Sequence, residues 1–135
     1  EAVELGDRIA VMRRGRIVED AEPEALWRAP KTAEGALLFS GAQQLNEAGA
    51  AAYGVAGAAV ILAGGAAAKA DANGTGRVVD CRFAGPLWQA TLEAIGHPGV
   101  FLRAEATGPL EPGTRASVTI DPARLRLFPS PAAID

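Results

Sequence analysis

The sequence of 135 residues is poor in the residue types that build most catalytic and metal sites. It contains one cysteine and one histidine, and aromatic residues make up 5% of it. The lone Cys81 excludes an internal disulfide, and a lone histidine excludes a metal centre built from several histidine ligands. The net charge of -3 provides no global positive field that would attract nucleic acid. We therefore expect no nucleic-acid partner.

The sequence also lacks a convincing membrane segment. No positively charged stretch followed by an apolar run opens the chain, so secretion is not indicated and a cytoplasmic location is expected. Residues Ala48–Ala68 carry no charge over 21 positions, which is long enough for a membrane span. Eleven of these residues are Ala and five are Gly, so the transfer energy that drives insertion is largely absent. We predict a small-residue linker with one short strand, Ala59–Ala63.

The first part of the chain contains a predicted β-hairpin. The apolar run Ile9–Met12 is typical of a buried strand, and Ile17 and Val18 begin a second strand after a polar turn. Gly15 can adopt the positive φ that a tight reversal needs. Before the hairpin, Glu1–Leu5 resembles the end of a helix that stops at Gly6. We therefore expect the chain to be a fragment that starts inside a longer protein.

Two short helices are predicted after the hairpin. Pro23 suits the first turn of a helix, and Glu24 and Arg28 have the spacing of an i, i+4 ion pair. Thr32 is a candidate N-cap for a second helix that continues to Phe39. A hairpin with two short helices buries too little apolar area to offset its ordering entropy. This segment should therefore pack on another part of the protein.

The second half of the chain is predicted to be a small β-barrel. In Trp88–Ile95, apolar and polar residues alternate, which indicates a strand with one buried face. The turn at residues 96–99 makes this strand and the next an antiparallel pair. Asp121 and Pro122 open a single helical turn. The other predicted strands are Gly76–Phe83, Val100–Glu105 and Arg115–Ile120. The fold class is thus mainly β, with a small OB-like antiparallel barrel preceded by a β-hairpin and two short helices.

Candidate chemical residues do not form a recognisable catalytic pattern. His97 lies in a GHPG turn, which favours an exposed turn residue over a ligand, and Cys81 in a strand is expected to be a buried, apolar thiol. The segment Gly74–Gly76 precedes a strand and lacks the flanking pattern of a phosphate loop. Three acidic residues occur on separate predicted strands, without the spacing of an acid/base pair: Asp80, Glu93 and Glu105. We assign no catalytic, cofactor-binding or metal-binding residue, and we expect no enzyme activity from this chain alone.

The aromatic residues have two possible roles. OB-type barrels use exposed aromatic rings to stack on nucleic-acid bases, whereas rings at alternating strand positions are also typical of a protein core. With a negative net charge, core packing is the favoured prediction. The residues concerned are Trp27, Phe83, Trp88, Phe101 and Phe128.

The hairpin region resembles the end of the ATP-binding subunit of ABC importers. The matching residues are Asp7–Met12 (DRIAVM), Gly15–Val18 (GRIV), Pro23–Trp27 (PEALW) and Pro30. The second half is similar to the transport-associated OB (TOBE) domain that follows the ATPase core in that family, above all in its ending from Ile120 to Pro129 (IDPARLRLFP). The two resemblances occur in the family's order.

The resemblance implies a division of the chain and a function for it. Residues 1–42 would be the C-terminal tail of the ATPase domain, 43–75 an Ala/Gly-rich linker or weak first strands, and 76–135 the TOBE domain. The chain would then be a regulatory and dimerisation region, with ATP and Mg²⁺ bound and ATP hydrolysed elsewhere in the longer protein. Its partners would be a second copy of the subunit and the transporter's membrane subunits, at the inner face of the cell membrane.

The resemblance leaves two questions open. Similar importers carry iron, polyamine, thiamine or phosphonate, and the substrate is not specified by this region. The alternative function is a barrel that binds a small anion, as in related molybdate-binding domains. In addition, the Ala-rich segment has poor β propensity, so the barrel is expected to be abbreviated or loosely held in its first half.

Overall fold

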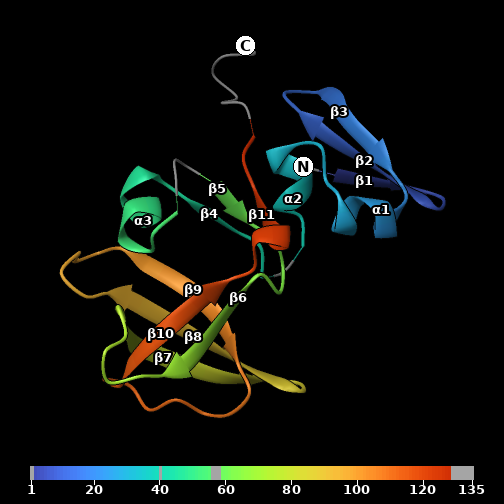
Figure 1. Cartoon of the computed structure of the whole chain (residues 1–135). Coiled ribbons are helices and arrows are strands. Elements are labelled where there is room, and N and C mark those ends of the chain that lie inside the picture. The colour runs from blue at the N-terminus through green and yellow to red at the C-terminus, as the bar shows by residue number, and fades with distance from the viewer. Residues whose placement is uncertain (1, 40, 56–58, 129–135) are drawn as a thin grey trace.

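The computed structural model describes residues 2–39, 41–55 and 59–128, and its strands form three sheets (Figure 1). The first sheet has the strand order β1-β2-β3, the second is a closed barrel with the order β10-β6-β9-β8-β7, and the third has the order β11-β5-β4. The elements are β1 (Ala2–Leu5), β2 (Arg8–Arg13), β3 (Arg16–Ala21), α1 (Pro23–Arg28), α2 (Ala33–Ala36), β4 (Gln43–Leu45), α3 (Glu47–Ala52), β5 (Ala59–Ile61), β6 (Ala66–Ala70), β7 (Gly76–Ala84), β8 (Leu87–Ala94), β9 (Phe101–Ala106), β10 (Arg115–Ile120), the 3₁₀ turn η1 (Pro122–Arg124) and β11 (Leu125–Arg126). The predicted fold class is confirmed.

The predicted hairpin is present, but the expected helix before it is a third strand. The two turn residues between β2 and β3, Arg14 and Gly15, both have positive φ, as a two-residue reversal with the twist of a hairpin requires. β1 pairs antiparallel with β2, with Ala2 opposite Val11. A single turn of helix gains little from its own hydrogen bonds, whereas the same residues gain a ladder on β2. Gly6 has positive φ, but it serves the β1–β2 turn instead of ending a helix.

Both predicted helices are present, and their end signals act as expected. Pro23 begins α1, and Arg28 forms an exposed ion pair with Glu24 at 2.9 Å. The Thr32 hydroxyl caps α2 by accepting a hydrogen bond from the backbone N–H three residues further on. α2 is shorter than predicted, because it stops before residues 37–39.

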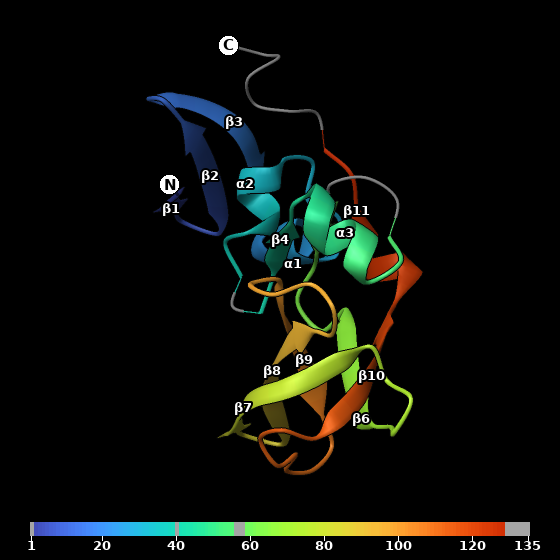
Figure 2. The same cartoon turned by 90° about the vertical axis from the view of Figure 1, so that its left-hand side faces the viewer.

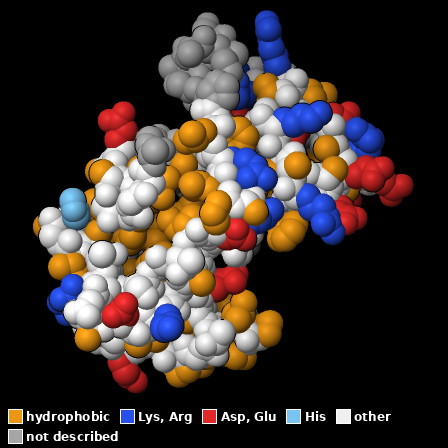
Figure 3. All heavy atoms as spheres, viewed as in Figure 1, with side chains coloured by type: hydrophobic (Ala, Val, Ile, Leu, Met, Phe, Trp, Pro, Cys, Tyr) orange, Lys and Arg blue, Asp and Glu red, His pale blue; other side chains and the backbone are white. Residues whose placement is uncertain are grey.

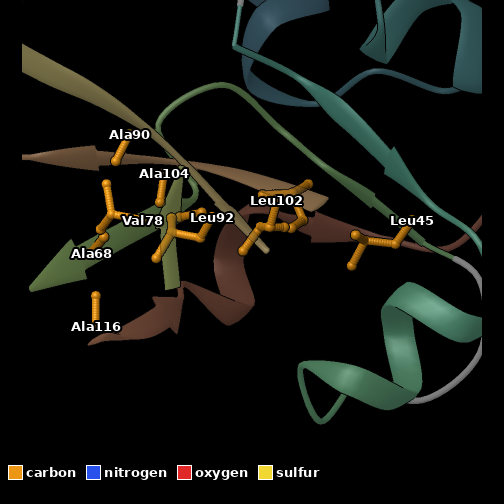
Figure 4. Packing of buried hydrophobic residues seen from close by; sticks show 10 residues of the cluster. Leu45, Ala68, Val78, Ala90, Leu92, Leu102, Ala104 and Ala116 are labelled. Carbon is orange, nitrogen blue, oxygen red and sulfur yellow. The ribbon is translucent and has the colours of Figure 1, made fainter. Parts of the chain in front are cut away.

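Small and large side chains together fill the barrel. Figure 4 shows Val78, Leu92 and Leu102 pointing into an interior that is otherwise lined by alanines. Five strands enclose a narrow space, so alternating small and large residues are needed to fill it without overlap. The alanines of this cluster are Ala66, Ala68, Ala90, Ala104 and Ala116.

The Ala-rich segment is therefore part of the barrel and not only a linker. β6 pairs antiparallel with β10 over five residue pairs, from Ala66 to Ala70, and is parallel to β9. This parallel pairing departs from the fully antiparallel barrel that the sequence predicts. Ala66 and Ala68 are the buried residues of β6, and a larger side chain at either position would not fit the barrel interior. This packing requirement outweighs the low β propensity of alanine. Among the described residues, no helix is long and apolar enough to cross a membrane.

The four strands predicted in the second half are confirmed within one or two residues as β7, β8, β9 and β10. Inward positions of β8 are buried, and β8 and β9 are antiparallel, as the turn at 96–99 predicts. The single helical turn after β10 is η1, whose N-cap Asp121 accepts a hydrogen bond from Ala123 N. These elements were predictable because each depends on neighbours a few residues away.

α3 lies near the start of β9, next to the loop that leads into that strand, as Figure 1 and Figure 2 show. Tyr53, which follows α3, packs against the barrel core and points its hydroxyl toward the Leu92 carbonyl at 3.5 Å. Burial raises the pKa of Tyr53 to about 12, with a smaller contribution from the negative charge of Glu93. α3 therefore helps to close the barrel over its apolar interior.

Candidate functional site

The small sheet β4-β5-β11 joins the N-terminal unit, which we define as residues 2–36, to the barrel. Alternate residues of the β5 segment point to opposite sides. Val60 and Leu62 pack with Ala36 of α2, while Ile61 belongs to the barrel core. Val60 and Ile61 of β5, and Leu62 just after it, are each at most 2% exposed. A strand covered on both faces thus couples the two parts of the molecule.

Arg124 ties the two parts together at the edge of this sheet, and we call this arrangement the Arg124 clamp. Its guanidinium Nε and Nη2 donate to the carbonyl of Ala63 at 3.2 and 3.1 Å. Its Nη1 donates to the carbonyl of Trp27 at 3.1 Å and, more weakly, to that of Arg28 at 3.5 Å. The guanidinium carbon also lies 4.1 Å from the centre of the Trp27 ring, a cation–π distance.

The position of the clamp follows from local structure and from one close approach. The 3₁₀ turn after β10 brings Arg124 beside Gly65, where an added Cβ would lie 2.8 Å from the Arg124 Cβ. The Arg124 carbonyl accepts a hydrogen bond from Leu62 N at 2.8 Å, so the backbone is held as well as the side chain. Trp27 and Arg28 end α1, and the clamp therefore places a cation on the unpaired carbonyls of a helix C-terminus.

Burial lowers the pKa of Arg124, with the positive charge of Arg126 as a second cause. An arginine starts from a pKa so far above neutrality that this shift leaves the guanidinium charged at physiological pH. The hydrogen bonds of the clamp are therefore charge-assisted under all ordinary conditions.

Within the N-terminal unit, the buried carboxylate of Glu19 connects β3 to the residues just before α2. Glu19 of β3 is 8% exposed and accepts hydrogen bonds from Lys31 N (2.8 Å), Thr32 N (3.1 Å) and the Thr32 hydroxyl (2.8 Å). Nearby, Arg13 of β2 forms a two-pronged ion pair with Glu34 of α2. The hydrogen bond from Arg13 lowers the pKa of Glu34. These contacts hold α2 and the residues just before it on the sheet.

The candidate residues from the sequence do not come together. His97 is an exposed turn residue, as predicted. Cys81 is half-buried, not fully buried, and its sulfur accepts a hydrogen bond from Leu110 N at 3.4 Å. Asp80 pairs with Arg82 on the surface. Within the described ranges, no group of three or more His, Cys, Asp or Glu residues could hold a metal ion.

The prediction that the aromatic residues form a core is wrong for three of them. Phe83 is 67%, Phe101 52% and Trp27 42% exposed. Trp88 is half-buried and meets the Phe83 ring edge-on, with 5.4 Å between ring centres. The narrow barrel is filled by alanine, valine and leucine, so Phe83 and Phe101 remain on its surface. Trp27 lies outside the barrel, on α1, where its ring contacts Arg124.

Sequence reasoning missed the Arg124 clamp. The segment Asp121–Arg124 indicated only a helical turn. No local sequence pattern predicts that Arg124 contacts Trp27, which lies 97 positions earlier in the chain. The ending Ile120–Pro129, which carried the family resemblance, contains this arginine and was the one signal in the sequence that could have pointed to it.

Figure 3 shows basic and acidic side chains gathered over the sheet β1–β3 and α1, with fewer charges on the visible face of the barrel.

Comparison with known proteins gives two matches. Residues 56–128, more than half of the chain, match the model of the TOBE domain. A curated relative, a sulfate/thiosulfate import ATP-binding protein of Chromobacterium violaceum, is 29% identical over 162 aligned residues. The alignment covers 98% of this chain and 44% of the relative, so the chain spans less than half the length of the curated relative it matches.

Proposed function

The chain belongs to the TOBE domain family, and from this premise we propose that it is the C-terminal regulatory region of the ATP-binding subunit of an ABC importer. The observation that carries the proposal is the Arg124 clamp. It joins the N-terminal unit, which resembles the end of such an ATPase domain, to the family's barrel. A regulatory domain needs a firm mechanical connection to the domain that it regulates.

In this proposal the longer protein binds ATP and Mg²⁺ and hydrolyses ATP, while the present region contributes no catalytic group. Residues 1–42 are the tail of the ATPase domain, and residues 76–135 are the TOBE domain, which supplies the barrel strands β7, β8, β9 and β10. The intervening residues 43–75 supply β6 and two of the three strands of the joining sheet, β4 and β5. The partners are a second copy of the subunit and the membrane subunits of the transporter, so the region lies in the cytoplasm at the inner face of the membrane.

The transported substrate is a separate part of the proposal. The relative's name specifies sulfate and thiosulfate, which differ from the iron, polyamine, thiamine and phosphonate expected from the family resemblance. We take sulfate and thiosulfate as the first substrates to test, because the relative aligns with nearly the whole of this chain. Uptake of labelled sulfate by cells with and without the gene would test this part alone.

The coding sequence upstream of Glu1 provides the first test of the proposed function. We expect a histidine a few codons before Glu1 and, farther back, a glycine-rich phosphate loop ending in Lys and Ser or Thr. The full-length protein should hydrolyse ATP. An upstream sequence without these motifs, or a full-length protein without ATPase activity, would show that the proposal is wrong.

A second experiment tests regulation through the clamp. In the full-length subunit assembled with its membrane subunits, Arg124→Ala should retain basal ATP hydrolysis but change its stimulation by the assembled transporter. Arg126→Ala is the matched control, because among the described residues the hydrogen bonds of the Arg126 side chain go to two nearby carbonyls, those of Ala123 and Leu125. Equal stimulation in the two variants would contradict a coupling role for the clamp.

A further inference from the structure

A small cavity opens on the side of the barrel, and its lining includes Gly64, which lies between the two residues that contact Arg124, Ala63 and Gly65. Its volume is about 160 Å³, and its lining includes parts of β8 and β9 and the loops before β4 and β6. Five lining residues carry polar groups: Gln43, Trp88, Gln89, Arg103 and Glu105. At roughly 30 Å³ per water molecule, the space suits a ligand of about five or six non-hydrogen atoms.

One wall of the cavity is held firmly in place. The side-chain amide of Gln43 takes the place of a neighbouring strand on β9: its Nε2 donates to Arg103 O at 2.5 Å, and its Oε1 accepts from Arg103 N at 2.9 Å. The Arg103 guanidinium donates through Nη2 to the carbonyl of Ala42 at 2.9 Å. These bonds orient Arg103 while leaving most of its N–H donors available to a ligand.

Opposite charges share this wall. Arg103 and Glu105 are two residues apart on β9, so their side chains lie on the same face of the strand. Both are exposed, and in the part of the chain that the structure describes no ion pair joins them. Gln89 of β8 lies directly opposite Glu105 and adds an amide that can donate and accept. The cavity thus offers a positive group, a negative group and an amide side by side.

We propose that this cavity binds a compact zwitterion, a small free α-amino acid, with its carboxylate at Arg103 and its ammonium group at Glu105. A small anion alone would meet the Glu105 carboxylate, and a small cation alone would meet the Arg103 guanidinium. A molecule with both charges satisfies both groups, and Gln89 can accept a further hydrogen bond from the ammonium. The site goes beyond the proposed importer function, since its two charged groups, Arg103 and Glu105, belong to the barrel strand β9 and take no part in the Arg124 clamp.

Calorimetry of the 135-residue chain tests the proposal with L-alanine as the probe. Propionate carries only the carboxylate of this probe, and isopropylamine carries only its ammonium group. We expect L-alanine to bind, and each half-probe to bind at least about tenfold more weakly because it forms one charge-assisted hydrogen-bonded contact fewer. No heat with millimolar L-alanine, or tighter binding of propionate or sulfate than of L-alanine, overturns the proposal.

Two variants test whether the heat measured with L-alanine comes from binding in the cavity. Glu105→Gln should weaken L-alanine binding by about tenfold or more, since it removes one charge-assisted hydrogen bond. Glu111→Gln is the matched control, because Glu111 is exposed and lies outside the cavity lining. Thermal unfolding of both variants monitors the fold. Equal affinity of the Glu105→Gln variant and the unaltered chain overturns the assignment, whatever the full-length protein does with ATP.

Discussion

Replacing Arg124 by alanine removes the contacts that the clamp makes between the barrel and the N-terminal unit. Two carbonyls, those of Ala63 and Trp27, lose charge-assisted hydrogen bonds at 3.1–3.2 Å, and the Trp27 ring loses its cation. Arg124 is half-buried, so each carbonyl is valued at about 1 kcal/mol, at the low end for such bonds. The cation–π contact adds roughly 0.5–1 kcal/mol. The expected loss in free energy of unfolding is about 2–3 kcal/mol.

Thermal unfolding followed by circular dichroism measures this loss. For a chain of this length, 1 kcal/mol corresponds to roughly 3–4 °C, so Tm should fall by about 6–12 °C. Arg124→Lys should recover only a small part of the lost free energy of unfolding, because a lysine ammonium group cannot reach both carbonyls as the planar guanidinium does. Arg126→Ala, whose bonds are local, should cost less than about 1 kcal/mol.

A double-mutant cycle isolates the ring contact. Trp27→Leu combined with Arg124→Ala should be less destabilising than the sum of the two single changes by roughly 0.5–1 kcal/mol. If Arg124→Ala lowers Tm no more than Arg126→Ala does, the reasoning that assigns the clamp a structural role is refuted.

Three further predictions concern other parts of the fold. Gly35→Ala should destabilise the chain by about 1–3 kcal/mol in urea unfolding, because the added Cβ would lie 2.3 Å from Glu19 Oε1; an unchanged midpoint would contradict this packing. Tyr53 is the only tyrosine, so ultraviolet titration should show phenolate forming near pH 12 in the folded chain and near pH 10 in urea; stability should therefore fall as pH rises from about 10 to 12. The hydrogen bond from Arg13 lowers the pKa of Glu34, so the ion pair contributes fully to the stability of the fold above pH 4.5, the ordinary pKa of this carboxyl group. That contribution is lost as pH falls below this value. The stability difference between the unaltered chain and Glu34→Gln should shrink on acidification below pH 4.5, and a difference that grows there would contradict the ion pair.

The β6 strand shows why propensity alone misjudged part of the fold. Alanine has a low β propensity, and the sequence predicted a linker or weak first strands for this segment. In the barrel, Ala66 and Ala68 are buried in one cluster with Leu92 and Leu102, and their small size suits the narrow interior that these leucines share. The requirement arises only once five strands have closed, and no window of the sequence contains it.

The sequence by itself determined the features whose causes lie within a few residues. Pro23 and Thr32 begin their helices, Gly15 permits the hairpin turn, and alternation sets the strands of the second half. The tertiary structure alone decided that residues 2–5 pair as a strand, that three aromatic rings lie on the surface, and that Arg124 bonds to the end of α1. These outcomes depend on partners far away in the chain, whose distances and available space exist only after the sheets have packed.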